Sequence, residues 1–319
     1  MRGSWRAALA AAWGRPGGRL GTLLLLGIVA AVALGPFLLP DPAAQPDILG
    51  GANLAPGAGH LFGTDQLSRD VLARVVAGGR VSLAVGGLAA LLSATLGLLV
   101  GLAAGYRGGA VDAVLMRLVD AALVVPRLFL LLLLLAAWER VPLAALVVVI
   151  GATGWFATSR LVRAEVLRLK AEPFVLAAEA LGAGGRRIIF RHLLPNALGP
   201  LVVAATLGVG EVILLEAGLS FLGLGIQPPT PSWGGMIYDA KDVLVTAPWG
   251  SVFPGLAIVL TVLAVHLVGD ALHAALDPRE AAIVAAVPAP ASIPAAEPVT
   301  RLDLEAGLAR MSDSREPAA

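Results

Sequence analysis

The feature that most constrains this chain is a series of six apolar stretches, each long enough to span a membrane. A helix needs roughly 20 mainly apolar residues to cross the hydrocarbon core of a bilayer. The six stretches cover residues 20–39, 82–105, 111–137, 142–159, 198–222 and 252–272. Each is therefore predicted to be a transmembrane helix, which makes the chain a multi-pass membrane protein.

The composition supports a helical membrane protein. Hydrophobic residues make up 58% of the 319 residues and charged residues only 14%, whereas soluble domains have about 45–50% and about 25%. A water-soluble fold of this composition would expose large apolar patches, which drive aggregation. Continuous apolar runs such as residues 130–135 lack the alternation of barrel strands, and alanine and glycine permit close helix packing in lipid. The expected fold class is thus an all-α bundle with six transmembrane helices.

Basic residues set the expected orientation. If the N-terminus is cytoplasmic, 17 of the 23 lysines and arginines fall in or near cytoplasmic segments. Cytoplasmic loops carry an excess of these residues, so both termini are expected in the cytoplasm and the chain in a bacterial inner membrane. The first apolar stretch has a competing interpretation as a cleaved signal peptide. A retained anchor is favoured because a signal-peptide core usually has only about 7–15 apolar residues.

The spans and their connections predict a linear organisation. It consists of a cytoplasmic N-terminus (1–19), a first transmembrane helix (20–39), an external connection (40–81), a five-helix core (82–278) that includes a long cytoplasmic loop (160–200), and a cytoplasmic tail (279–319). Apolar residues at helical spacing over 65–81 indicate an amphipathic interfacial helix, with Thr64 or Asp65 as its N-cap. The tail composition is typical of disorder, with residues 299–311 as a candidate short helix.

The chain lacks the motifs of an ATPase, a metalloenzyme or a nucleophilic enzyme. Its two lysines, Lys170 and Lys241, are followed by Ala171 and Asp242, so neither belongs to a phosphate-binding loop. There is no cysteine, and the four histidines are scattered, which leaves no metal-ligand pattern. The net charge of +1 gives no support for nucleic-acid binding. No enzymatic activity and no cofactor are expected, and any ATP hydrolysis would belong to partner subunits.

The cytoplasmic loop over 160–200 has a helical pattern of its own. Phe174, Ala177, Ala178 and Leu181 lie at helical spacing, glycines at 182, 184 and 185 interrupt the helix, and a second helix is expected to end at Pro195. Such a unit can insert into a groove on a cytosolic partner. It can equally pack on its own bundle, with its arginines against anionic lipid headgroups. The residues alone leave both interpretations open.

The pairs Ala177-Ala178 and Leu194-Pro195, together with Gly182 and His192, make this loop similar to a family motif. It resembles the EAA loop in permease subunits of ATP-binding-cassette (ABC) importers, where the loop contacts an ATPase subunit and transmits its closure to the membrane helices. The family's leading glutamate is replaced by Leu176, so Glu179 is not assigned the role of that acid. The resemblance implies an ATPase-coupling set of Phe174, Ala177, Ala178, Glu179, Ala180, Leu181, Gly182, Ala183, Arg187, His192, Pro195 and Asn196.

The resemblance extends over roughly residues 60–280. Segments 62–72, 105–109, 216–225, 228–234 and 276–279 follow the order of dipeptide and oligopeptide permeases, and the similar subunit is the dipeptide permease "C" protein. The resemblance implies a type I ABC importer permease bundle that works by alternating access. Its implied partners are a homologous second permease subunit, two ATPase subunits and an extracytoplasmic substrate-binding protein.

The substrate stays open between dipeptides, oligopeptides, nickel chelates and glutathione, because related permeases handle all of them. Two other functions also stay open. An ion-coupled secondary transporter would require inverted repeats or a run of buried titratable residues. A non-transporting membrane scaffold would leave the long cytoplasmic loop without a role.

Five charged residues lie in the predicted spans. A charge at mid-bilayer costs about 3 kcal/mol, so each is a candidate for a translocation path or for anchoring helices together. They are Arg117, Asp120, Arg127, Glu211 and Glu216. Asp120 is spaced to pair with Arg117, or to line a water-filled path with Arg127. Glu211 and Glu216 cannot share a helical face, and Glu216 is expected to be an anchor. An arginine at position 127 is not typical of the resembled family, so no substrate contact is assigned to Arg127.

Overall fold

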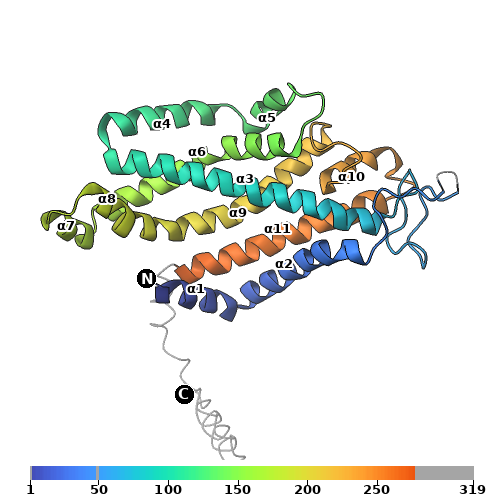
Figure 1. Ribbon diagram of the computed structural model, residues 1–319, viewed down its shortest axis with the longest axis horizontal. Coiled ribbons are helices and arrows are strands. Elements are labelled where there is room, and N and C mark those ends of the chain that lie inside the picture. The colour runs from blue at the N-terminus through green and yellow to red at the C-terminus, as the bar shows by residue number, and fades with distance from the viewer. Residues whose placement is uncertain (1, 48–49, 277–319) are drawn as a thin grey trace, which may run out of the picture. The chain divides into compact units, whose positions relative to one another are not determined.

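The computed structural model describes residues 2–47 and 50–276, and every regular element within these ranges is helical. Figure 1 shows the long helices lying side by side. They are α2 (Pro16–Leu34), α3 (Val71–Arg107), α6 (Leu143–Lys170), α9 (Leu194–Phe221) and α11 (Trp249–Leu276). Within the bundle, α3 packs against α6 and α9, and α11 packs against α2 and α9. The predicted all-α class is confirmed.

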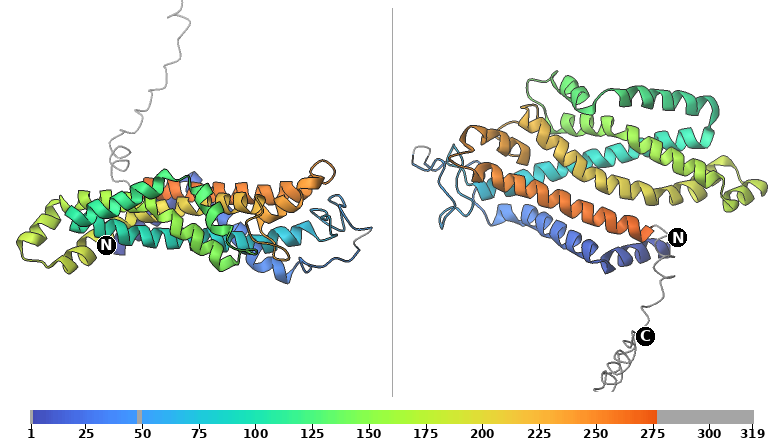
Figure 2. Two further views of the ribbon diagram at one scale, coloured as in Figure 1. Left: turned by 90° about the horizontal axis from the view of Figure 1, so that it is seen from above. Right: turned by 180° about the vertical axis from the view of Figure 1, so that it is seen from behind.

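The shorter elements gather at the ends and at one edge of the bundle. At one edge, α4 (Gly109–Val124) and α5 (Arg127–Leu135) lie beside α6. One end carries α1 (Arg2–Gly14), α7 (Pro173–Ala180), α8 (Gly185–Ile188) and the π-helical turn η2 (Ile189–Leu193). The other end carries the 3₁₀ turns η1 (Gly35–Phe37) and η3 (Lys241–Val243), with α10 (Trp233–Asp239). Figure 2 shows the same two groups at opposite ends from behind.

Five helical segments are long and apolar enough to cross a membrane, and a sixth arises if a bent helix pair counts as one span. The five are Pro16–Phe37, Val71–Arg107, Leu143–Lys170, Gly185–Phe221 and Trp249–Leu276, and the bent pair joins α4 to α5. The positions match the six predicted stretches.

The predicted span over 111–137 is broken into two helices. Its two halves, α4 and α5, meet at an angle of 84°. The break falls at Val125 and Pro126, where Val125 has the extended backbone angles φ −80° and ψ 123°. A residue before proline is disfavoured in the helical region because the proline ring crowds its backbone. The proline therefore ends α4, and α5 begins again at Arg127.

The predicted separate amphipathic helix over 65–81 is also wrong. A single helix begins at Val71 and runs without interruption to Arg107. Its N-cap is Asp70, whose side chain accepts a hydrogen bond from the backbone N–H of Ala73, and not Thr64 or Asp65. The apolar residues Val71, Val75 and Val76 are buried against the bundle. Their helical spacing therefore marks a packed core face of a long helix and not a membrane-interface helix.

The loop that was predicted to be cytoplasmic, over 160–200, is shorter and more helical than expected. The helix α6 extends to Lys170, and the segment Gly185–Phe221 is one continuous run of helix through α8, η2 and α9. Pro195 therefore does not end the second helix. It lies just after the wide turn η2, in the first turn of α9, where a missing N–H is tolerated. The predicted tail and its candidate helix over 299–311 lie outside the described residues.

Candidate functional site

A cavity of about 570 Å³ opens between α3, the α4–α5 break, α6 and α9. Most of its lining residues are small or apolar, and the charged side chains among them are Arg127 and Glu211. Arg127 is the first residue of α5, so the break between α4 and α5 sets the position of its guanidinium. Polar groups otherwise come from hydroxyls such as Ser93 and Thr153 and from the imidazole of His266.

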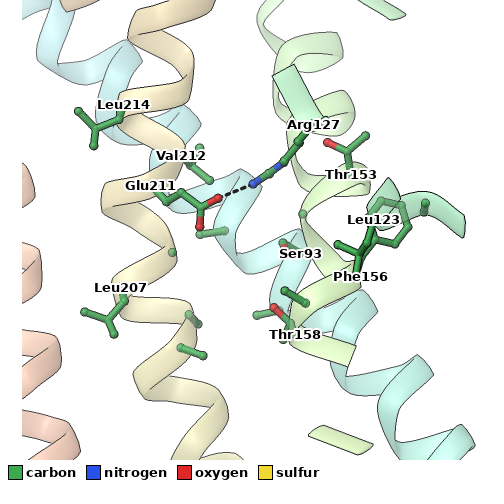
Figure 3. A pocket seen from close by; sticks show the side chains of 18 of the residues that line it. Ser93, Leu123, Arg127, Thr153, Phe156, Thr158, Leu207, Glu211, Val212 and Leu214 are labelled. Atoms are coloured by element: carbon green, nitrogen blue, oxygen red, sulfur yellow. Dashed lines mark hydrogen bonds and ion pairs between the residues drawn. The ribbon is translucent and has the colours of Figure 1, made fainter. Parts of the chain in front are cut away.

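The two charged side chains meet across the cavity, as Figure 3 shows. Arg127 Nη1 donates to Glu211 Oε1 at 2.8 Å, and Arg127 Nη2 donates to the backbone oxygen of Ile150 at 3.0 Å. The third nitrogen, Nε, is buried and has no hydrogen-bond partner among the described residues. The Glu211 side chain is 70% exposed and that of Arg127 is 26% exposed. The pair is thus partly open, with an unused donor on the arginine.

The other charged residues singled out in the spans have different environments. Asp120 forms its ion pair with Arg160 of α6, and not with Arg117 or Arg127, and both paired side chains are about half exposed. The sequence analysis missed Arg160 because it placed this residue in a cytoplasmic loop. Glu216 is fully buried and points away from the cavity. Of the five candidates, the structure brings only Arg127 and Glu211 together.

Glu216 is the centre of a buried hydrogen-bond network near the C-terminal end of α9. Its carboxyl group accepts from Ser220 at 2.7 Å and from Ser82 of α3 at 3.1 Å. The Ser82 oxygen also accepts the backbone N–H of Trp233, the first residue of α10, at 3.2 Å. This geometry joins α3, α9 and α10. Isolated serines in an apolar stretch carry no signal by which the sequence could have identified them as partners.

A second group of charges fixes the segment before α3 to α10. Arg69 Nε lies 2.6 Å from Asp65 Oδ2, and Arg74 Nη2 lies 3.2 Å from Asp239 Oδ2. Both arginines are nearly buried. Burial raises the pKa of the Asp239 carboxyl group, while the positive charges of Arg74 and Arg69 oppose that effect. Both arginines pair with aspartates of the cluster, which is typical of a structural role, although Arg74 Nη1 is buried without a hydrogen-bond partner in the described part of the chain.

The residues of the predicted coupling set lie together at the opposite end of the molecule. Val175 of α7 is fully buried in a cluster with Val166, Leu169 and Ile188, which holds α7 against the end of α6 and against α8, from which the chain continues into α9. Around it, the side chains of Phe174, Leu176, Leu181 and Phe190 are exposed. The ring of His192 lies 6.2 Å from that of Phe174. An apolar surface is therefore presented on a small, anchored helical unit.

The end of α7 has the geometry of a Schellman motif. The N–H of Ala183 donates to the oxygen of Ala178 at 3.0 Å, and that of Gly182 donates to the oxygen of Glu179 at 2.9 Å. Gly182 has a φ of +77°, a left-handed conformation that glycine adopts without strain. This turn sends the chain back from α7 into α8, and glycine at this position is the signal that the sequence offered for it.

The chain is similar to known transport proteins over most of its length. Residues 97–281 match the family described as "Binding-protein-dependent transport system inner membrane component". A protein of Brucella suis is 44% identical over 261 residues, which is 81% of this chain and 86% of its own length. The dipeptide transport system permease protein of Bacillus subtilis is 40% identical over 81% of each chain. The glutathione transport system permease protein of Pectobacterium atrosepticum is 38% identical over 81% of this chain and 85% of its own.

Proposed function

The chain belongs to the family of binding-protein-dependent transport system inner membrane components, and from this premise we propose that it forms one half of an import path for dipeptides or oligopeptides. It is a permease subunit of an ABC importer and a multi-pass membrane protein. The peptide substrate is supported by the named relatives, which include a dipeptide and an oligopeptide permease of Bacillus subtilis. The cavity containing Arg127 and Glu211 is the section of the path that this chain contributes.

Four partners complete the proposed importer: a homologous second permease subunit, two ATPase subunits and an extracytoplasmic substrate-binding protein. The exposure of Glu211 supports the second permease, because a 70% exposed carboxylate inside a span needs either water or a facing protein. ATP hydrolysis belongs to the ATPase subunits. The Asp120–Arg160 pair anchors α4 to α6, and Glu216 anchors α9 to α3 and α10, whereas Arg117 is exposed on α4.

The exposed apolar surface on the anchored helix α7 is the observation that carries the coupling role. Val175 fixes α7 to the bundle, so a partner that moves α7 also moves the ends of α6 and α9. The proposed contact set includes Phe174 and Leu181, which are exposed, and Arg187 beside them on α8. Closure of the ATPases would then shift the helices between inward-open and outward-open states.

The proposed orientation places α7 in the cytoplasm. Arg2, where α1 begins, and Leu276, where α11 ends, lie at the same end of the bundle as α7. The basic residues Arg168, Lys170, Arg186, Arg187 and Arg191 also belong to this end. An excess of basic residues favours the cytoplasmic side, and this supports cytoplasmic placement of both ends of the bundle.

The test is ATP-dependent uptake of a labelled dipeptide into proteoliposomes that hold the whole assembly, with binding protein on the external side. We compare the wild type with Gly182→Val and Gly184→Ala. A Cβ at either position meets nothing within 4 Å, but only Gly182 has a positive φ. Valine at 182 therefore strains the end of α7, while alanine at 184 is a matched control for the loss of a glycine.

We expect Gly182→Val to insert normally and to lose at least about tenfold in both uptake and peptide-stimulated ATP hydrolysis, because about 1–3 kcal/mol of backbone strain would displace the coupling unit. Gly184→Ala should retain both activities. If Gly182→Val transports as well as the wild type, the coupling role of this unit is wrong. If the chain alone moves peptide on an ion gradient, the importer proposal itself is wrong.

A further inference from the structure

Of the five charged residues singled out in the predicted spans, Arg127 and Glu211 line the cavity of about 570 Å³, and Glu211 is mostly exposed there. Glu216 is fully buried and accepts two hydroxyl hydrogen bonds. Glu211 instead uses Oε1 for Arg127, and its side chain is mostly exposed. A charge near mid-bilayer costs about 3 kcal/mol. The pair joins α5 to α9, and its carboxylate is also open to the cavity, so it is available to a ligand as well as to its partner.

The guanidinium of Arg127 has capacity for a further acceptor. It has five N–H donors in a planar fork, of which Nη1 and Nη2 each use one, toward Glu211 and the Ile150 oxygen. The Nε–H is buried and has no hydrogen-bond partner within residues 2–47 and 50–276. Carboxylates bind such a fork through two parallel hydrogen bonds. Nη1 and Nη2 each keep a second N–H, and Glu211 keeps Oε2 beyond the oxygen that pairs with Arg127, so the pair retains donors and an acceptor for a ligand.

The volume and lining of the cavity suit a small zwitterion. Its volume of about 570 Å³ lies within the roughly 300–1,000 Å³ of small-molecule sites. An extended dipeptide spans at most about 7 Å, so both of its charged ends fit within one such cavity. The remaining lining is mainly small residues such as Ala90, Ala157 and Gly208, which leaves space for varied side chains.

We propose that Arg127 and Glu211 form a site for the two charged termini of a peptide, with Arg127 taking the carboxylate and Glu211 the ammonium group. This inference rests on the proposed function in peptide import. In the empty path the two side chains pair with each other, as in this structure. A peptide exchanges that internal pair for two contacts of its own. The exchange makes binding selective but weak, which a conducting path requires. Arg127 therefore contacts the substrate in this proposal, although the family resemblance did not imply such a contact.

The test measures peptide binding to the complete importer in nanodiscs. The external binding protein is left out, so any preference for free peptide termini comes from the site in the membrane subunits. The probes are one labelled dipeptide with free ends, its N-acetylated form and its C-amidated form. The variants are Arg127→Gln, Arg127→Lys and Glu211→Gln. Glu139→Gln and Arg140→Gln are matched controls, because these residues are exposed, follow α5 and do not line the cavity.

We expect the wild type and both controls to bind the free dipeptide about tenfold more tightly than either blocked form, the effect of losing one charge-assisted contact. Arg127→Gln should abolish the discrimination against the C-amide and keep that against the N-acetyl form. Glu211→Gln should do the reverse. Arg127→Lys keeps the charge without the fork and should discriminate at an intermediate level, which also shows that position 127 tolerates substitution.

A wild type without preference for free termini, or variants that keep the full wild-type pattern, would overturn the site. Uptake by the wild type with binding protein and ATP is measured in parallel and tests the proposed function separately. If the wild type imports the dipeptide while the variants keep the wild-type discrimination, only the terminus-binding site is wrong. If the wild type imports no peptide at all, the proposed function is wrong.

Discussion

Glu211 and Glu216 lie five positions apart on α9 and have opposite surroundings. Glu211 faces the cavity, while the side chain of Glu216 is inaccessible to solvent and held by Ser82 and Ser220. Five residues correspond to about 140° around a helix, since each residue turns it by about 100°, so the two carboxyl groups were expected on different faces. What distinguishes their roles is the set of hydroxyl partners, which comes from a distant helix and a neighbouring turn.

We predict that Glu216→Ala lowers the free energy of unfolding by about 3 kcal/mol. The change leaves a small cavity and removes the acceptor from two buried hydroxyl groups. Glu216→Gln keeps the size and one acceptor oxygen, and should cost about 1 kcal/mol or less. Thermal unfolding of the purified importer measures both. Equal stability of the alanine variant and the wild type would contradict the anchoring role.

At the scale of elements, the tightest helix contact in the bundle depends on glycines of α3. Gly97, Gly101 and Gly105 recur every four residues on the face toward α6. A Cβ at Gly101 would lie 2.7 Å from Cβ of Val162 and 3.0 Å from the backbone nitrogen of Arg163. In a membrane, small residues at this spacing let two helix backbones approach closely. The pair α3–α6 therefore depends on the absence of side chains at these positions.

We predict that Gly101→Val destabilises the α3–α6 pair by about 2 kcal/mol, the usual cost of overpacking a filled contact. Gly87→Val on the same helix is the matched control, because a Cβ there meets nothing within 4 Å. Thermal unfolding and retention of the assembled complex on a sizing column report the difference. Similar behaviour of the two variants would show that close approach at Gly101 is not needed.

The sequence predicted the elements better than their boundaries. Continuous apolar length specified where the spans lie, because the bilayer imposes it. Pro126 alone is a signal for a break in the helix. The angle of 84° between the two halves could not be predicted, because it depends on packing against α6. The joining of residues 71–81 to the second span was hidden, because burial against the bundle and burial in an interface produce the same apolar spacing.

At the scale of the whole molecule, the site was less predictable than the fold. The pairing of Arg127 with Glu211 brings together residues 84 positions apart, and no local pattern announces such a contact. The helix α7 and its C-terminal turn were predictable because their determinants, Gly182 and the residues of α7, are adjacent in sequence. The direction in which the bundle crosses the membrane depends on charge bias and is the remaining global property to test.

We predict that a cysteine at Leu181 reacts only from the cytoplasm and a cysteine at Val245 only from the outside. The chain has no cysteine of its own, so each single variant has one thiol. The two side chains are 88% and 95% exposed, and they lie at opposite ends of the bundle. Labelling with a membrane-impermeant maleimide in intact cells and in inverted vesicles measures the sidedness.

Adding the ATPase subunits to the inverted vesicles extends this measurement from orientation to assembly. Leu181 belongs to the proposed contact surface of α7, so the bound ATPases should slow labelling of a cysteine at position 181 at least about tenfold. A cysteine at Val245 is labelled in intact cells instead. Its labelling should be the same whether or not the ATPases are co-expressed. Labelling at 181 from the outside would reverse the proposed orientation. Cytoplasmic labelling that the ATPases leave unchanged would keep the orientation and exclude Leu181 from the contact, since a thiol covered by a bound partner cannot react at its free rate.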